Sequence, residues 1–455
     1  MKSIKIPGKA ILVLGALICL HNSAAAQVRL PIFKPCKSAS APKLPARWHA
    51  VALMSPFTDS QLDIGEFIYD GALPAMRATI YGLGAGVADI LITDKDTFLI
   101  TGRHDAPEQC ISLGQKFNPP SAQWLAKEAS CSGTAPIGSK WLEWWKSPGP
   151  YSMANWLLFR TESGLPWRSL FVAPSRDPAI IGGYAMSYFP EFSSLSETKL
   201  SRLRDFCASH LKTADLKLLP PTPTARELMN IRNPAGESER EQRIAALVPG
   251  LSLKACSSMT PPVWPDKYVM TAIITPNLFE APGPLPSVIY YDWREAATQE
   301  AIMFLPQTIP PVPKLLAYLK KGVGYDVKQH EGKPLECRPS YPGIVRPDWM
   351  KAANCKCKGV LDHNPDLNPR DVTQILACPI KHQEPRVLWS WYTTEGHPVV
   401  FAEAGARGNG LMQADYHQWF PGMSVPASEF ELPKACTNSV NTDDTRSCSD
   451  CHTVR

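Results

Sequence analysis

The stretch RWHAVALMSP (47–56) returns at a constant offset as KYVMTAIITP (267–276), and this repetition decides how the chain is organised. Both stretches are apolar and favour extended backbone, so each is expected to be a buried β-strand. Similarity that continues over a long separation indicates that one unit occurs twice. Further pairs agree in the same order along the two halves: Cys36 and Cys256, Pro45 and Pro265, Asp70 and Asp292, Cys110 and Cys337, Trp124 and Trp349, Cys131 and Cys357, Gly164 and Gly396, Pro190 and Pro421, Cys207 and Cys436.

These pairs define the expected domains. The first copy covers about 36–210 and the second about 256–440. The linker at 211–255 begins with several prolines and contains a predicted short amphipathic helix at 237–248. The tail at 441–455 is polar and belongs to neither copy.

The predicted fold class is mainly β, or α+β with few helices. Stretches rich in β-branched and aromatic residues alternate with turn candidates such as Asp94-Lys95-Asp96 and Glu162-Ser163-Gly164. One short helix is expected in each copy, around 121–129 and 347–354. The sequence therefore predicts two tandem antiparallel-sheet domains that disulfides stabilise.

The first 26 residues have the pattern of a cleavable secretory signal. Three lysines precede the apolar run Ala10–Leu20, and Ala24-Ala25-Ala26 supplies small residues for cleavage. The run is too short to cross a bilayer as a helix, and no later stretch predicts a membrane span. We therefore expect a periplasmic or secreted protein.

Net charge argues against a nucleic-acid partner. The full chain carries a formal charge of +5, and removal of the three signal lysines leaves about +2. So small an excess creates no strong field toward nucleic acid or anionic lipid. The 45 prolines favour turns and loops over long helices.

Loss of the signal, with Cys19, leaves an even number of cysteines, as is usual in exported disulfide-bonded proteins. Spacing alone does not fix the pairing. We predict that the first cysteine of each copy bonds to the last, and that the two middle ones bond to each other. The predicted bonds are Cys36–Cys207, Cys110–Cys131, Cys256–Cys436, Cys337–Cys357 and, in the second copy alone, Cys355–Cys378.

Two cysteines in the tail have no counterpart in the first copy. They form Cys448-Ser449-Asp450-Cys451-His452, the C-x-x-C-H spacing of covalent haem c attachment. Two thiols bond to the haem vinyl groups, and the adjacent histidine is the proximal iron ligand. A tail disulfide, half of a zinc site and a redox pair are alternative interpretations.

Only three residues follow His452, so another part of the protein must cover a bound haem. This short ending is similar to that of cytochromes c′, although their four-helix bundle is not predicted here. Met412, His417 and Met423 are candidates for the sixth iron ligand, and each is also an ordinary surface or core residue type.

The second half resembles an uncharacterised family of secreted plant and microbial proteins. The resemblance rests on Tyr290-Tyr291-Asp292-Trp293 and on Gly343-Ile344-Val345-Arg346-Pro347-Asp348-Trp349. It covers 265–436 well and 45–207 weakly. It implies a secreted β-rich domain and leaves the chemistry open. This chain departs from the family, which is usually a single copy and lacks a haem motif.

Other polar or aromatic groups have structural interpretations. Asp70 and Asp292 occupy equivalent positions, where a carboxylate more often caps a turn or pairs with a cation such as Arg294 than acts as a base. The tryptophans of 141–145 favour packing over ligand stacking. The glycine-rich 82–86 lacks the lysine and helix of a phosphate loop. Three scattered histidines show no metal-ligand spacing: His104, His363 and His382.

Two functions follow from these patterns. The first is an exported c-type haem protein that transfers electrons to a redox partner or binds a small ligand at the iron. The second is a haem-free, disulfide-rich binding or carrier protein for a hydrophobic or carbohydrate ligand. No pattern predicts a catalytic residue, so the sequence favours a protein without enzymatic activity.

Overall fold

The computed structural model describes about two thirds of the chain, including both repeats and part of the linker. The described residues are 28, 31–37, 40–82, 86–102, 104–114, 117, 129–148, 154–173, 182–187, 192–213, 228, 237–252, 254–276, 283–293, 302–306, 314–320, 323–329, 336–340, 346–362, 372–379, 387–393, 395–404, 411–431, 434 and 436. The expected signal, residues 121–128 of the helix predicted at 121–129, and the tail at 441–455 lie outside them.

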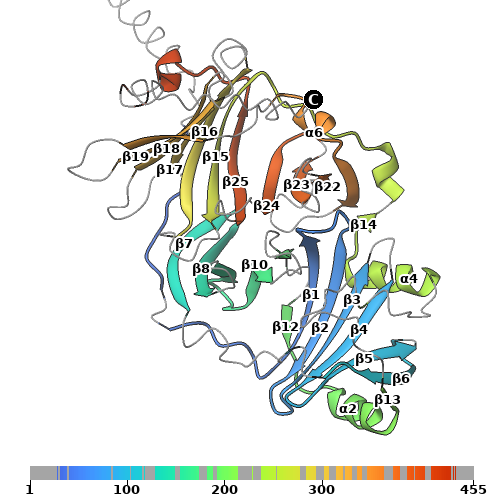
Figure 1. The fold of residues 1–455 in the computed structure, drawn as a ribbon. Coiled ribbons are helices and arrows are strands. Elements are labelled where there is room, and N and C mark those ends of the chain that lie inside the picture. The colour runs from blue at the N-terminus through green and yellow to red at the C-terminus, as the bar shows by residue number, and fades with distance from the viewer. Residues whose placement is uncertain are drawn as a thin grey trace, which may run out of the picture.

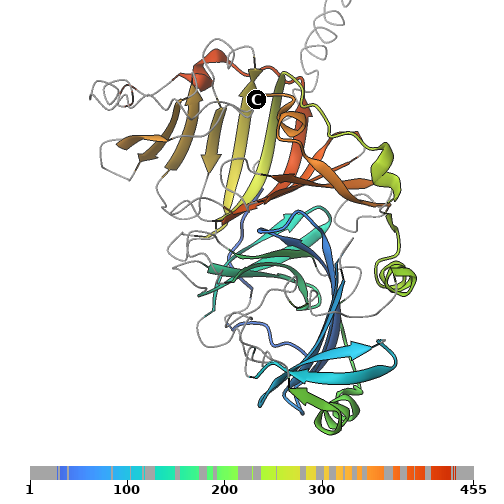
Figure 2. The same cartoon turned by 45° about the vertical axis from the view of Figure 1, so that its right-hand side comes forward.

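Residues of the first half form one antiparallel sheet with a parallel strand at one end, which curves strongly (Figures 1 and 2). Its strands are β1 (Arg47–Pro56), β2 (Asp63–Asp70), β3 (Ala75–Gly82), β4 (Val87–Thr93), β5 (Thr97–Gly102), β6 (Pro107–Ser112), β7 (Ser130–Ile137), β8 (Lys140–Pro148), β9 (Ala154–Arg160), β10 (Pro166–Ala173), β11 (Gly182–Ser187), β12 (Phe192–Ser194) and β13 (Leu211–Thr213).

The second half forms another antiparallel sheet, which lies above the first in Figure 1. Its strands are β14 (Leu251–Ser252), β15 (Lys267–Pro276), β16 (Leu285–Asp292), β17 (Ile302–Pro306), β18 (Lys314–Lys320), β19 (Val323–Gln329), β20 (Glu336–Ser340), β21 (Lys356–Leu361), β22 (Thr373–Pro379), β23 (Val387–Thr393), β24 (Pro398–Ala404) and β25 (Leu411–Pro421). The predicted β-rich, antiparallel fold class is confirmed.

The two sheets have the same topology. The first runs β6-β5-β4-β3-β2-β1-β11-β10-β9-β8-β7, and the second runs β20-β19-β18-β17-β16-β15-β25-β24-β23-β22-β21. Details repeat too. Trp48 stacks on Tyr69 at 5.5 Å between ring centroids, and Tyr268 stacks on Tyr291 at 4.5 Å. The predicted repetition of one β unit is therefore confirmed.

Helices are few and short in the described residues, as the proline-rich sequence predicts. They are α2 (Leu200–Ser209), α4 (Glu237–Leu247) and α6 (Trp349–Ala352), with 3-10 turns η3 (Lys254–Ser258) and η4 (Ala427–Phe430). Helix α4 is the predicted linker helix, and α6 lies inside the predicted 347–354. None of the helices described is long and apolar enough to span a bilayer.

Five disulfides use every cysteine proposed for pairing, but four of the five predicted partners are wrong. The bonds are Cys36–Cys131, Cys110–Cys207, Cys256–Cys357, Cys337–Cys436 and Cys355–Cys378, so only the last was predicted correctly. The first four bonds are two in each copy: Cys36–Cys131 is equivalent to Cys256–Cys357, and Cys110–Cys207 is equivalent to Cys337–Cys436. Disulfides in this number are typical of extracellular or periplasmic proteins.

Strand order explains the error. Cys110 on β6 and Cys131 on β7 lie near opposite ends of the first sheet, too far apart to bond. Lys34 pairs with Thr134 on β7, which brings Cys36 to that end of the sheet. Strand β13 pairs with β6, and α2, which precedes β13 in the chain, packs beside β6, which brings Cys207 to the other end. Sequence order alone does not reveal which strands are outermost.

A single hydrophobic core joins the two copies. It includes Leu53 and Trp144 of the first copy, Ile273 and Trp391 of the second, and Ile244 of α4. Each residue is largely removed from water, and burial of a large apolar side chain stabilises by about 1.5–3 kcal/mol. The two sheets therefore share one hydrophobic core across their boundary and are not two separately packed domains joined by a linker.

Two tryptophans, one from each copy, donate hydrogen bonds to the other copy across this boundary. The indole nitrogen of Trp156 donates to the carbonyl of Pro276 at 2.6 Å, and that of Trp389 donates to the carbonyl of Pro56 at 2.6 Å. Strand registers place these tryptophans at equivalent positions, and likewise the two prolines. Reciprocal contacts are the signature of two-fold symmetry, so the copies pack as the subunits of a symmetric dimer do.

One contact across the boundary breaks that symmetry. Arg168 on β10 forms a buried ion pair with Asp415 on β25, and Gln413 donates to the same carboxylate at 3.1 Å. The register places Val400 at the position equivalent to Arg168. The duplicated halves have therefore diverged inside their shared interface.

Candidate functional site

A row of polar side chains crosses the first sheet at a place where the sequence is otherwise apolar. Glu66 on β2 lies directly opposite Thr79 on β3, and Thr79 lies opposite Asp89 on β4. Directly opposite residues project from the same face, so the three side chains form one row. Glu66 and Asp89 are 3% and 4% exposed, and carboxylates this buried require partners.

Glu66 is held by groups from three elements. Arg243 of α4 donates to its Oε1 at 2.6 Å, and Nε2 of His49 on β1 lies 3.2 Å from the same oxygen. The hydroxyl of Tyr81 donates to Oε2 at 3.3 Å. Burial raises the pKa of Glu66, but the bonds from His49 and Arg243 outweigh it and lower the pKa to about 2. Glu66 is therefore an anion at neutral pH.

Asp89 makes a second, bidentate pair on the same face. Nε and Nη2 of Arg77 donate to its two oxygens at 2.9 and 2.5 Å, and the Thr79 hydroxyl donates at 3.0 Å. Arg77 also donates to the backbone carbonyl of His104 at 2.9 Å. The planar guanidinium matches a carboxylate in this geometry and fixes both side chains.

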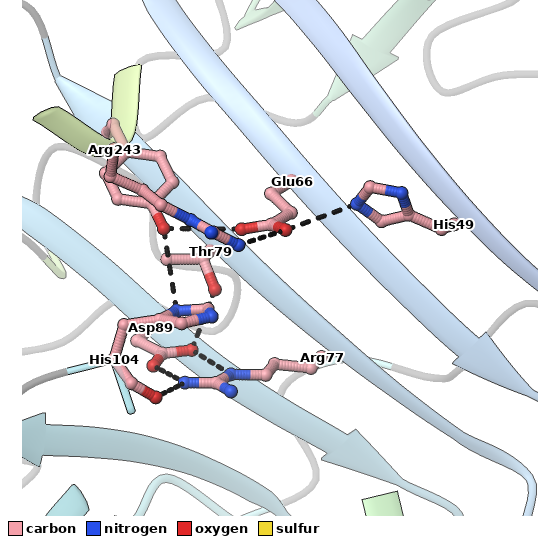
Figure 3. A network of polar contacts seen from close by, with 8 residues as sticks. His49, Glu66, Arg77, Thr79, Asp89, His104 and Arg243 are labelled. Carbon is pink, nitrogen blue, oxygen red and sulfur yellow. Dashed lines mark hydrogen bonds and ion pairs between the residues drawn. The ribbon is translucent and has the colours of Figure 1, made fainter. Parts of the chain in front are cut away.

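His104 joins the two pairs, as Figure 3 shows. Its Nδ1 lies 3.5 Å from the Tyr81 hydroxyl. Burial and the charge of Arg77 lower the pKa of His104, against the opposing effect of Asp89 and Glu66. The imidazole is therefore neutral at pH 7, with one donor and one acceptor nitrogen.

A cavity of about 310 Å³ lies between this row and α4. Its walls come from β3, β4, the end of β5 and the helix. The lining residues are Thr79, Tyr81, Val87, Asp89, Gly102, His104, Asp105, Arg240, Gln242, Arg243 and Ala246. Arg243 reaches from α4 to the sheet beside the cavity, so the linker helix forms one wall (Figure 3).

The second copy has apolar residues at the positions of Glu66, Thr79 and His49. The register aligns Glu66 with Val288, Thr79 with Leu305 and His49 with Val269. Val288 and Val269 are buried. The polar row is therefore a property of the first copy and not of the repeated fold.

The structure does not describe the residues that the sequence predicts to attach haem. Cys448, Cys451 and His452 lie outside the described residues, and so does the side chain of Met412. His417 is exposed on β25, and Met423 follows that strand. The haem therefore stays a prediction, as does the choice of its sixth ligand.

Several other candidates have structural roles. Asp70 pairs with Arg47 at 3.0 Å and Asp292 with Lys267 at 2.7 Å. A cation partner of the predicted kind is therefore found in both copies, Arg47 in the first and Lys267 in the second, whereas Arg294 lies outside the described residues. Trp144 donates to Thr275 of the second copy at 3.1 Å, as expected for packing between copies.

Of the three scattered histidines, His104 is described by the structure and belongs to this site. His363, His382 and residues 83–85 of the glycine-rich stretch lie outside the described part. Among the residues that are described, no group of three or more histidine, cysteine or acidic side chains could hold a metal ion.

The partners that build the cavity were not predicted from the sequence. The available signal was an acid in the interior of each of two buried strands, Glu66 in DIGEFIYD and Asp89 in VADILIT. A carboxylate in such a strand must be paired, which predicts nearby cations but not their identity. Arg243 is distant in sequence and meets Glu66 only through the tertiary fold.

Comparisons with known proteins do not assign this chain to a family. No family model and no curated protein matches it. A solved structure of an uncharacterised conserved protein from Thermus thermophilus is similar, with 11% identity and a TM-score of 0.26 over 38% of this chain and 92% of that one.

Structures of MucB in complex with MucA also match weakly. One shows 9% identity and a TM-score of 0.21, and covers 83% of this chain and 94% of that one. The other, of the Pseudomonas aeruginosa MucA/MucB complex, shows 10% identity and a TM-score of 0.21 over 65% and 88%. TM-scores this low assign neither a fold nor a function. The resemblance to a secreted family stays a prediction.

Proposed function

We propose that the chain is an exported binding protein that holds a small polar ligand in the cavity between α4 and the first sheet. The observation that supports this most is the polar row of Glu66, Thr79 and Asp89 beside a cavity of about 310 Å³. Ligand sites typically measure about 300–1,000 Å³ and contain a few fixed polar groups.

A purely structural role explains the row poorly. Burying charged groups costs free energy even when they are paired, and apolar residues of similar size are often as stable or more so. The second copy has the same topology with Val288 and Leu305 at the positions of Glu66 and Thr79. The fold therefore does not need the charges, which favours a function specific to the first copy.

The location follows from the sequence and the cysteines. The expected signal at 1–26 directs export, and five disulfides suit an oxidising compartment. We place the protein in the periplasm or outside the cell, where a small ligand would be captured without being changed.

A matched pair of substitutions on α4 tests this function. Ala246 and Ala245 are both exposed, but only Ala246 lines the cavity. Ala246→Phe fills the cavity, whereas Ala245→Phe adds the same ring beside it. The mature protein is screened by thermal shift against sugars, carboxylates, phosphates and amines.

We expect at least one compound to stabilise the wild type and Ala245→Phe but not Ala246→Phe, since only a ligand of the folded state raises its melting temperature. If no compound shifts the melting temperature, or if Ala246→Phe responds like the wild type, the proposal is wrong.

A second candidate function is haem c binding at Cys448, Cys451 and His452. The ten other cysteines of the expected mature chain form five disulfides with one another. Cys448 and Cys451 thus have only each other as cysteine partners, and their thiols fit the donor set that haem attachment requires. A bound haem would supply a one-electron redox couple.

Intact mass and a reduced-minus-oxidised spectrum test the haem. The protein is exported in a host with haem-attachment machinery, beside Cys448→Ala/Cys451→Ala. Covalent haem adds its own mass and a c-type spectrum, and both are lost in the double variant. A mass equal to the polypeptide with six disulfides would contradict haem attachment and leave the cavity unaffected.

A further inference from the structure

We propose that the ligand of this cavity is an uncharged polyhydroxy compound of about monosaccharide size. This inference rests on the proposed binding function and adds the chemical class of the ligand. It is drawn from the charges that line the cavity, the hydrogen-bonding groups of the lining and the cavity volume.

The charges that line the cavity balance. Arg240 and Arg243 are opposed by Asp89 and Asp105. Behind this lining, Arg77 makes a bidentate pair with Asp89, and Arg243 is bonded to Glu66 (Figure 3). A charged ligand would leave one charge in the site without an opposite one, which is costly in a partly buried place. An uncharged ligand keeps the balance.

The lining offers both donors and acceptors of hydrogen bonds. Carboxylates only accept and guanidinium groups only donate, whereas hydroxyl and neutral imidazole groups do both. The cavity has all of these, in Asp105, Arg240, Tyr81 and His104. A ligand hydroxyl can donate to one and accept from another, so a compound with several hydroxyl groups fits this mixed wall better than an acid or an amine does.

The size of the cavity suits a ligand of about one sugar ring. Its volume of about 310 Å³ equals about ten water molecules at liquid density. A ring with several hydroxyl groups replaces such waters and keeps their hydrogen bonds, whereas an apolar ligand of this size would leave the polar wall unsatisfied. Val87 and Ala246 supply apolar contacts in the same wall, against which the carbon skeleton of such a ring can pack.

Titration calorimetry on the mature protein tests the ligand class. The probes are D-glucose, D-galactose, D-mannose and N-acetylglucosamine, with citrate, inorganic phosphate and putrescine as charged compounds. Each is measured with wild type, Ala246→Phe and Ala245→Phe at low and high sodium chloride.

We expect at least one sugar to bind wild type and Ala245→Phe. The dissociation constant should change less than about twofold between roughly 20 and 500 mM salt, because screening acts on charged ligands. Binding should weaken at least tenfold in Ala246→Phe. None of the charged compounds should bind at this site.

A charged compound that binds wild type, but not Ala246→Phe, would overturn the uncharged class and leave the binding function intact. If no probe binds in any protein, both the class and the binding function are contradicted. Sugar binding that survives in Ala246→Phe would place the sugar elsewhere and also contradict the inference.

A substitution at Asp105 tests the charge balance directly. Asp105 is exposed, so Asp105→Asn is expected to fold normally. The variant leaves one positive charge in excess in the lining. We expect it to gain measurable affinity for phosphate, with strong salt dependence, and to bind the sugar several-fold more weakly. Unchanged behaviour toward both compounds would contradict the charge argument.

Discussion

The two copies share strand order, paired disulfides and reciprocal tryptophan bonds, yet they differ on one face of the sheet. The first copy has Glu66 and Thr79 in neighbouring strands, and the second has Val288 and Leu305 in the same registers. The apolar version shows that the polar groups are not required for this topology. Comparison of two copies in one chain therefore separates the residues that make the fold from those available for function.

The largest expected effects concern the disulfides that the copies share. Removing Cys110–Cys207 or its equivalent Cys337–Cys436 opens loops of similar length, with separations of 97 and 99. We expect each pair of Cys→Ala changes to lower the free energy of unfolding by about 4–5 kcal/mol. Loss of the shorter Cys355–Cys378 loop, with a separation of 23, should cost about 3 kcal/mol.

Denaturant unfolding of the three double variants measures this. Equal losses for the two long-range bonds would strengthen the equivalence of the copies. If removal of Cys337–Cys436 lowers the free energy of unfolding by several kcal/mol less than removal of Cys110–Cys207 does, the two copies are not equivalent in stability.

The asymmetric ion pair should have the next largest effect. Arg168→Met leaves the buried Asp415 without its guanidinium partner, and a broken buried pair typically costs about 3–5 kcal/mol. The double variant Arg168→Met/Asp415→Leu removes both charges and should recover much of that loss. Urea unfolding of both variants checks this, and an equal loss in both would contradict the charge explanation.

The reciprocal tryptophans test the two-fold relation of the copies. Trp156→Phe and Trp389→Phe each remove a hydrogen bond to a carbonyl and leave a small void. We expect each to cost about 2 kcal/mol, because the contacts are equivalent. Trp141→Phe, at a less buried position, is the control, with an expected loss of about 1 kcal/mol or less.

Thermal unfolding of these three variants decides the point. If one of the two interface variants is far less stable than the other, the reciprocal bonds are not energetically equivalent and the dimer-like description of the boundary fails.

Acid stability distinguishes the polar face of the first copy. The pKa of Glu66 falls from 4.5 to about 2 in the folded protein. A depressed carboxyl pKa stabilises the fold above the unfolded value, and this stabilisation is lost as pH decreases from about 4.5 to about 2. The contribution should be about 2–3 kcal/mol, and Glu66→Gln should reduce the pH dependence in that range by this amount.

Unfolding midpoints of wild type and Glu66→Gln between about pH 2 and 7 provide the measurement. The register partner in the second copy, Val288, cannot titrate, and Val288→Ala is the control for loss of packing. Parallel pH profiles for wild type and Glu66→Gln would show that Glu66 is not the group responsible.

The sequence predicted the repeated strands because buried strands impose an apolar pattern that can be compared directly. It also predicted the linker helix, since the apolar residues Ile244 and Leu247 recur at helical spacing. It did not predict the partners in the four long-range disulfides, which depend on the spatial order of strands and not on their order in sequence. It also missed Arg243, because the contact with Glu66 joins residues 177 positions apart.

Hydrogen–deuterium exchange with and without bound ligand tests the central claim most directly. The ligand is the compound that gives the largest thermal shift. We predict slower exchange in peptides from β3, β4 and α4, and unchanged exchange in β16, which has Val288 in place of Glu66. Slower exchange in the second copy alone, or equal protection in Ala246→Phe, would contradict a ligand site in the first copy.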